Sequence, residues 1–167
     1  IAAKDGSVTT FGATVADPED ERRVLAWAPT EMHDVHGNRI VYRWTKAPGR
    51  EGSRHWEELF LSSIAYVETD PDRFLLTVEL HYEPRPDPLS DRRGGFEVRT
   101  LRRCTAIEVH SHADGDALVK RWELAYEGPS RLVRIRLVGH DGQRQEYLHL
   151  PPIDRIAQRH QEIAQRQ

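Results

Sequence analysis

The chain has 167 residues, 38% of them hydrophobic, which is enough for one domain with a single core. Its 24 basic and 27 acidic residues leave a net charge of −3, and this balance excludes a general electrostatic attraction to nucleic acid or to an anionic membrane. The single cysteine, Cys104, excludes a disulfide bond within the chain, so the fold does not depend on an oxidising compartment.

The sequence carries no targeting signal that we can identify. The first residue is Ile1 rather than Met, and the residues that follow it do not form a positively charged segment and then an apolar run. No apolar run is long enough to cross a membrane. We therefore expect a segment of a larger protein, without a membrane span and without a signal peptide of its own.

Alternating hydrophobicity predicts about eight or nine strands of ordinary length. In residues 74–82 every second residue is apolar, which is the clearest pattern of a half-buried strand in the chain. A polar loop with Gly and Pro is predicted at 46–54. The predicted strands, in chain order, lie within residues 1–20, 24–27, 40–44, 59–67, 74–82, 96–101, 118–126, 133–137 and 148–152.

A tight hairpin is predicted between the second and third of these strands. Gly37 and Asn38 can adopt the positive φ angles that such a turn needs, and the side chain of Asp34 can bond the backbone ahead of it. Tyr42 then falls on one face of the next strand, and the turn fixes the register of the strand pair.

The chain is organised around the stretch 84–104. Its first part, 84–88, has three prolines at alternate positions, and proline has no N–H to donate. We expect this part to run as an extended connection without a continuous hydrogen-bond ladder. The chain then turns at Gly94-Gly95 and enters a strand that begins at Phe96.

The block from Arg85 to Cys104, followed by a His pair at 110 and 112, resembles in order the "RPDPFS…GFEVRT…RC…H" pattern of the SpvB-type domain. That domain opens the B subunits of Tc insecticidal toxin complexes and of related Rhs-type toxins. The hairpin at 34–42 is similar to the tyrosine-aspartate repeats of Rhs proteins. The residues that carry the resemblance are Asp34, Gly37, Asn38, Tyr42, Arg85, Asp87, Ser90, Gly95, Phe96, Glu97, Arg99, Arg103, Cys104, Pro151 and Pro152.

The resemblance implies an all-β fold over residues 1–152, with mostly antiparallel hairpins in a Rhs-shell-like sheet. It also implies a non-catalytic structural role in the B component of a secreted bacterial toxin complex, whose β shell encloses a toxic effector and helps to deliver it. The implied partners are the flanking Rhs-type repeat shell and the other subunits of the complex. No cofactor and no catalytic residue are expected.

The family pattern stops after Pro152. From Ile153 to Ala164 apolar residues recur at helical spacing, and the segment contains no Gly or Pro. We therefore predict a short amphipathic helix in the tail, residues 153–167.

A metal-dependent hydrolase is one alternative to the structural role. On a strand, His110 and His112 would project from the same face, and Asp114 could complete a site of nitrogen and oxygen ligands. However, Asp114-Gly115-Asp116 has the composition of a turn, which explains these residues without an ion. A general acid and base at Glu57-Glu58, or at Glu19 with Glu21, is a further hypothesis, but exposed carboxylates are expected in a chain that is 31% charged.

A module that binds carbohydrate or another surface is the second alternative. Four tryptophans, at 27, 44, 56 and 122, could stack on sugar rings. Three of them lie at alternating apolar positions, which favours packing within the protein. This alternative predicts an exposed platform at Trp56 or Trp44, and Trp56 is the first candidate because it follows the predicted polar loop.

Overall fold

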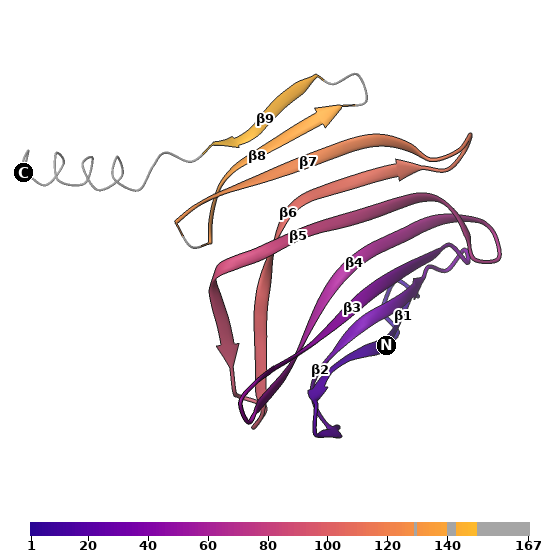
Figure 1. The fold of residues 1–167 in the computed structure, drawn as a ribbon. Coiled ribbons are helices and arrows are strands. Elements are labelled where there is room, and N and C mark those ends of the chain that lie inside the picture. Colours follow the sequence, from indigo (N-terminus) through magenta and orange to yellow (C-terminus); the bar gives the residue numbers. More distant parts are fainter. Residues whose placement is uncertain (129, 140–142, 150–167) are drawn as a thin grey trace, which may run out of the picture.

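The computed structural model describes residues 1–128, 130–139 and 143–149 (Figure 1). They form a single sheet of nine strands in sequence order. The strands are β1 (Val8–Asp17), β2 (Asp20–His33), β3 (Arg39–Glu51), β4 (Arg54–Asp70), β5 (Arg73–Asp91), β6 (Glu97–Ser111), β7 (Ala117–Glu127), β8 (Arg131–Gly139) and β9 (Arg144–His149).

Each strand pairs antiparallel with the next, so the predicted all-β fold of antiparallel hairpins is confirmed. The helix predicted for 153–167 lies outside the described residues, as do Pro151 and Pro152. The residues that the structure describes include no helix that could span a membrane.

The alternation along β5 divides the sheet into an apolar and a polar face. Val78 is in register with Ile64 on β4 and with Val109 on β6, and all three are half-buried. One residue further along β5, Glu79 is opposite Ser63 and Glu108. Because side chains alternate along a strand, one register places apolar groups together on one face and polar groups on the other.

The hairpin between β2 and β3 is held by the side chain of Asp34. Its carboxylate accepts hydrogen bonds from the backbone N–H of His36, at 2.8 Å, and from the backbone and side-chain N–H groups of Asn38, at 2.8 and 2.6 Å. These bonds hold the pKa of Asp34 below its ordinary value, and the bond from the Asn38 side chain has the largest effect. Gly37 has a φ of +84°, whereas the positive φ predicted for Asn38 is not observed.

β5 continues through the prolines, but its pairing is interrupted there. The register passes from Pro84 opposite Arg102 to Leu89 opposite Thr100, so four residues of β5 face Leu101 alone. The predicted break in the ladder is therefore confirmed, although the strand itself does not end. Both strands bend sharply at this point in Figure 1, and we call residues 84–89 with 100–102 the corner.

β4 is shared by two other strands along one edge. Its second half pairs with β5, from Ser63 to Asp70. Near its beginning, Trp56 and Glu57 pair in parallel with Glu97 and Val98 of β6. The sheet therefore separates below the middle of β4 and joins again at its lower end, where the β3–β4 and β5–β6 turns lie close together (Figure 1).

The described part of the chain buries few apolar side chains. Five apolar residues are buried, and three of them are alanines: Ala16, Trp56, Ala65, Phe74 and Ala106. No second sheet or helix covers the apolar face within the described residues, and the apolar residues along it are only half-buried. The molecule is thus one curved layer rather than two packed layers.

Candidate functional site

The corner is closed by a buried carboxylate, that of Glu58 on β4. Its side chain accepts hydrogen bonds from the backbone N–H of Leu101, at 2.7 Å, and of Arg102, at 3.0 Å. The Arg102 guanidinium donates to the other oxygen at 2.6 Å. Glu58 is only 2% exposed, so the expectation of a solvated carboxylate was wrong. Its carboxylate takes the place of a neighbouring strand for two N–H groups of β6.

Arginines of β6 cover aromatic rings of β4 beside this carboxylate. The Arg102 guanidinium lies 4.8 Å from the ring centroid of Phe60, and that of Arg99 lies 3.7 Å from the centroid of Trp56. Phe60 also meets Tyr82 of β5 edge to face, with ring centroids 5.0 Å apart. These contacts fill the space where β4 has separated from β5 and β6.

Trp56 is 7% exposed, so the prediction that it would be the exposed tryptophan was wrong. Its indole packs against Gly49 in the facing position of β3, where a Cβ atom would lie 2.2 Å from the ring. The loop predicted at 46–54 was wrong, because residues 46–51 belong to β3 and Arg54 begins β4. Trp27 is instead the exposed tryptophan, at 60%, and Trp44 donates its indole N–H to the carbonyl of Pro29 at 2.7 Å.

Two tyrosine hydroxyls tie the next part of the sheet together. Tyr82 donates to the carbonyl of Leu61 at 2.8 Å, and burial raises the pKa of Tyr82 to about 12. Tyr126 donates to the carbonyl of Cys104 at 2.6 Å, and the Arg103 guanidinium lies 4.6 Å from its ring centroid. Burial also raises the pKa of the Cys104 thiol, which disfavours the reactive thiolate.

Glu97 collects three donors at the start of β6. Arg99 donates to it at 2.7 Å, Ser90 at 3.0 Å and Arg92 at 3.2 Å. The hydrogen bond from Arg99 has the largest effect and lowers the pKa of Glu97. Burial opposes this effect, the bonds from Ser90 and Arg92 add to it, and the pKa falls to about 2. Arg99 also pairs with Glu51 of β3 at 3.0 Å, so the cluster links β3, β5 and β6.

The proline stretch is attached to the β7–β8 turn. Arg85 and Asp87 form an ion pair at 3.2 Å, and the hydroxyl of Ser130 accepts from Arg85 and donates to Asp87, both at 2.6 Å. The hydrogen bonds from Arg85 and then Ser130 hold the pKa of Asp87 below its ordinary value.

The β5–β6 turn is attached to β2. Gly95 has a φ of +80°, and its carbonyl accepts a hydrogen bond from Arg23 at 2.9 Å. The same guanidinium lies 5.7 Å from the ring centroid of Phe96 and pairs with Asp17 at 2.6 Å. The residues expected from the central sequence block are therefore spread over the corner and its supports, and Gly95, Phe96 and Glu97 among them line a pocket of about 350 Å³.

The predicted trio His110, His112 and Asp114 does not form a site. His110 Nδ1 lies 3.0 Å and His112 Nδ1 3.6 Å from a carboxylate oxygen of Asp116, so Asp116 rather than Asp114 contacts both histidines. His112 Nε2 is 2.9 Å from the hydroxyl of Thr77. The turn at Gly115, with a φ of +112°, brings Asp116 back towards the strand.

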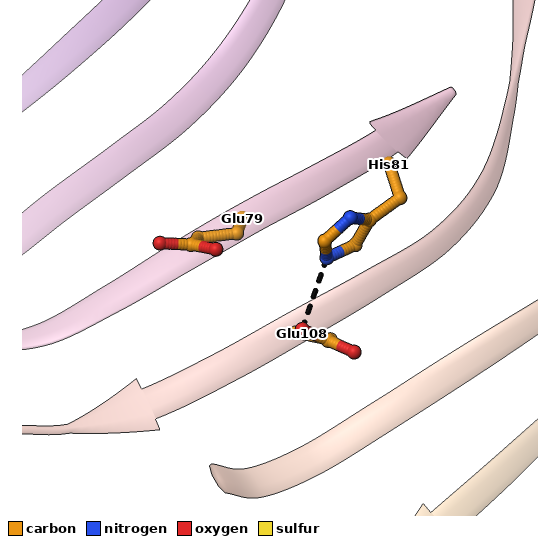
Figure 2. Close-up of side chains that lie close together, drawn as sticks. All are labelled: Glu79, His81 and Glu108. Carbon is orange, nitrogen blue, oxygen red and sulfur yellow. Dashed lines mark hydrogen bonds and ion pairs between the residues drawn. The ribbon is translucent and has the colours of Figure 1, made fainter. Parts of the chain in front are cut away.

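A second group of titratable side chains lies on the polar face of β5 and β6 (Figure 2). Three side chains each place one possible ligand atom within 4.8 Å of the other two: Glu79, His81 and Glu108. His81 Nε2 and His110 Nε2 approach the same oxygen of Glu108, at 2.9 and 3.3 Å, and Arg121 pairs with the other oxygen. Burial raises the pKa of Glu108, but the hydrogen bonds to the two histidines outweigh it and the pKa is lowered.

Sequence reasoning missed this group because it depends on the register between two strands. Alternation alone places Glu79 and His81 on one face of β5. It does not say which residue of β6 lies opposite, and that residue is Glu108.

Solved structures share this fold. The N-terminal domain of the effector protein SpvB from Salmonella typhimurium strain LT2 superposes with a TM-score of 0.72 and 21% identity, over 81% of this chain and 59% of that one. The chain has the SpvB-type fold. A TcdB2-TccC3 structure gives a TM-score of 0.69 at 20% identity over 85% of this chain and 10% of that one. The Photorhabdus luminescens Tc holotoxin pore gives 0.68 at 19%, over 85% and 9%.

The resemblance to the SpvB-type domain is thus confirmed for the fold. The chain spans less than two thirds of the length of each of these structures. No family model matches the chain.

Curated relatives correct the expectation that the chain is not an enzyme. It is 35% identical over 136 residues to phosphoserine aminotransferase of Neisseria gonorrhoeae (strain ATCC 700825 / FA 1090), and equally to that of Neisseria meningitidis serogroup C. These relatives are named for an enzyme, so the prediction of a non-catalytic chain was wrong. The matched segment covers 78% of the chain but 33% of those proteins, so the chain spans about one third of their length.

We predict that Glu58→Ala lowers the free energy of unfolding by about 3–5 kcal/mol, because it leaves two backbone N–H groups and one guanidinium without their acceptor. Urea unfolding followed by circular dichroism measures the loss. Glu58→Gln keeps an oxygen for the N–H groups, so its loss is smaller. Glu19→Ala, whose side chain is 69% exposed, is the control. Equal stability of Glu58→Ala and the wild type would show that the corner does not depend on this carboxylate.

We predict that acid destabilises the chain in part through Glu97. Because its pKa is about 2 in the folded chain and 4.5 ordinarily, its contribution is present above pH 4.5 and is lost as the pH falls towards 2. We expect Glu97→Gln to have a lower thermal midpoint at about pH 7 and a flatter decline in acid than the wild type. Thermal unfolding at a series of pH values measures both, and parallel curves would contradict the assignment.

Proposed function

We propose that this chain is a structural module of a bacterial toxin complex, in which its sheet forms part of the wall of a β shell around a toxic effector. The observation that carries this proposal is the half-buried apolar face of a one-layer sheet. Such a face is stable in water only when something else covers it. In a shell, neighbouring sheets and the enclosed polypeptide would provide that cover.

The two end strands support the same proposal. β1 and β9 each have a neighbour on one side only among the described strands, and an open edge is a place for another strand to pair. Exposed apolar residues gather at the β1 end: Ile1 (82%), Val8 (44%), Phe11 (38%) and Trp27 (60%). The partners we propose are the flanking Rhs-type repeat shell and the other subunits of a secreted complex.

The proposed module covers residues 1–152, with 153–167 as a helical tail. Within it, the residues of the central block, from Arg85 to Cys104, would hold the corner that gives the wall its curvature. Their contacts to β2, β3, β4 and the β7–β8 turn are the support for this role.

Electron cryomicroscopy of the full-length protein that contains this chain tests the proposal. We expect β1 and β9 to pair with strands of neighbouring segments, and the apolar face to be covered by a wall or by enclosed polypeptide. The proposal is overturned if the sheet stands apart from the rest of the protein with both end strands unpaired and its apolar face open to solvent.

Amino transfer is a second candidate, favoured by the 35% identity to phosphoserine aminotransferase. A pocket of about 350 Å³ at the β1–β2, β3–β4 and β5–β6 turns is lined by three arginines and three carboxylates: Arg23, Arg54, Arg92, Asp17, Glu19 and Glu97. Arg23 pairs with Asp17 and Arg92 with Glu97, so Arg54 is the guanidinium that we propose for the phosphate of such a substrate. With phosphoserine and a 2-oxo acid, the full-length protein is expected to form the matching amino acid, and Arg54→Ala to weaken the reaction. No product from the full-length protein would remove this candidate.

A further inference from the structure

We propose that Glu79, His81 and Glu108 form a binding site for a divalent transition-metal ion, with Zn²⁺ the ion that best suits their donor atoms. This proposal is independent of the role in a toxin complex. It rests on the register of β5 and β6, on the distances between three side chains and on the contacts that hold one of them.

The register places two negative charges directly opposite each other. Glu79 of β5 is paired with Glu108 of β6. Like charges in directly opposed positions destabilise a sheet. Glu108 is matched by Arg121 of β7 and by two histidines, but Glu79 makes no hydrogen bond or ion pair with the described residues. A cation held between the two carboxylates would remove their repulsion and would give Glu79 a partner.

The third ligand lies beside the carboxylates. His81 is two residues after Glu79 and therefore projects from the same face of β5, and its ring points to Glu108 (Figure 2). His81 Nε2 is 2.9 Å from Glu108 Oε2, and the three donor atoms lie within 4.8 Å of one another. A tetrahedral zinc ion with bonds of about 2.0–2.2 Å holds its ligand atoms roughly 3.4 Å apart. Rotation of the exposed side chains of Glu79 and His81 can close that difference.

Other side chains hold Glu108 in place. Its side chain is 12% exposed, and Arg121 binds the oxygen that does not face His81. His110 Nε2 lies 3.3 Å from a carboxylate oxygen of Glu108, and His110 Nδ1 lies 3.0 Å from one of Asp116. Because both of its ring nitrogens face carboxylates, His110 orients Glu108 rather than binding the ion. Supporting contacts of this kind commonly fix metal ligands in position.

The donor set selects the class of ion. One imidazole nitrogen with two carboxylate oxygens is a set that zinc and similar ions accept, whereas calcium and magnesium prefer oxygen ligands alone and more of them. Three protein ligands leave a fourth position for water or for a donor from another molecule. The exposure of Glu79 and His81 leaves the site open to ions from solution.

Calorimetric titration of the full 167-residue chain with ZnCl₂ tests the proposal. We expect one ion per chain, and a loss of affinity of about tenfold or more in each of Glu79→Gln and His81→Gln. Titration with Co²⁺, followed by visible absorption, reports the same site through its ligand-field bands. His36→Gln, at the exposed tip of the β2–β3 hairpin, is the matched control and should bind as the wild type does.

Thermal unfolding provides a second readout. Without metal, Glu79→Gln should unfold at a higher temperature than the wild type, because the opposed charges are gone. Zinc should raise the midpoint of the wild type and leave that of Glu79→Gln unchanged. The proposal is overturned if the wild type binds no zinc. It is also overturned if the His81→Gln variant, shown by circular dichroism to be folded, binds zinc with unchanged affinity. A third contrary result would be loss of binding in His112→Gln but not in His81→Gln.

Discussion

The Glu58 carboxylate is the contact on which the shape of the sheet depends. β5 cannot supply a continuous hydrogen-bond ladder to β6 at the corner. Its prolines lack N–H groups, and four residues of β5 lie opposite the single residue Leu101 of β6. Glu58 accepts the two β6 N–H groups there and binds Arg102 with its other oxygen. A buried polar group must find a partner, and the Glu58 side chain is the acceptor for three donors at once. β4 can therefore separate from β5 and still remain attached to β6.

Arginine side chains cover aromatic rings throughout this one-layer sheet. Five arginines lie over aromatic rings, at positions 23, 39, 99, 102 and 103. Arg99 and Arg102 each place the guanidinium over a ring and also donate to a carboxylate. Lysine, a compact point charge, cannot do both. Only three of the 24 basic residues are lysines, and this preference for Arg has a structural use.

The local features of the fold could be predicted, and the contacts between distant strands could not. Alternation identified β5, the proline spacing identified the break at the corner, and Asp34 with Gly37 identified a hairpin, because each depends on residues close in sequence. The burial of Glu58 and Trp56 depends instead on β6, about 40 residues later. The likeness to aminotransferase sequences was not predicted from residue chemistry.

The order of the strands also determines how the chain can fold. Eight of the pairings join neighbours in sequence, so each hairpin can form with its own turn as soon as it is synthesised. The parallel contact of Trp56 with Glu97 is different, because it needs all of β5 to be in place first. Closing that loop is the entropically costly step. A nascent chain would therefore add hairpins one at a time and acquire its curvature in a single later event, when β6 reaches back to β4.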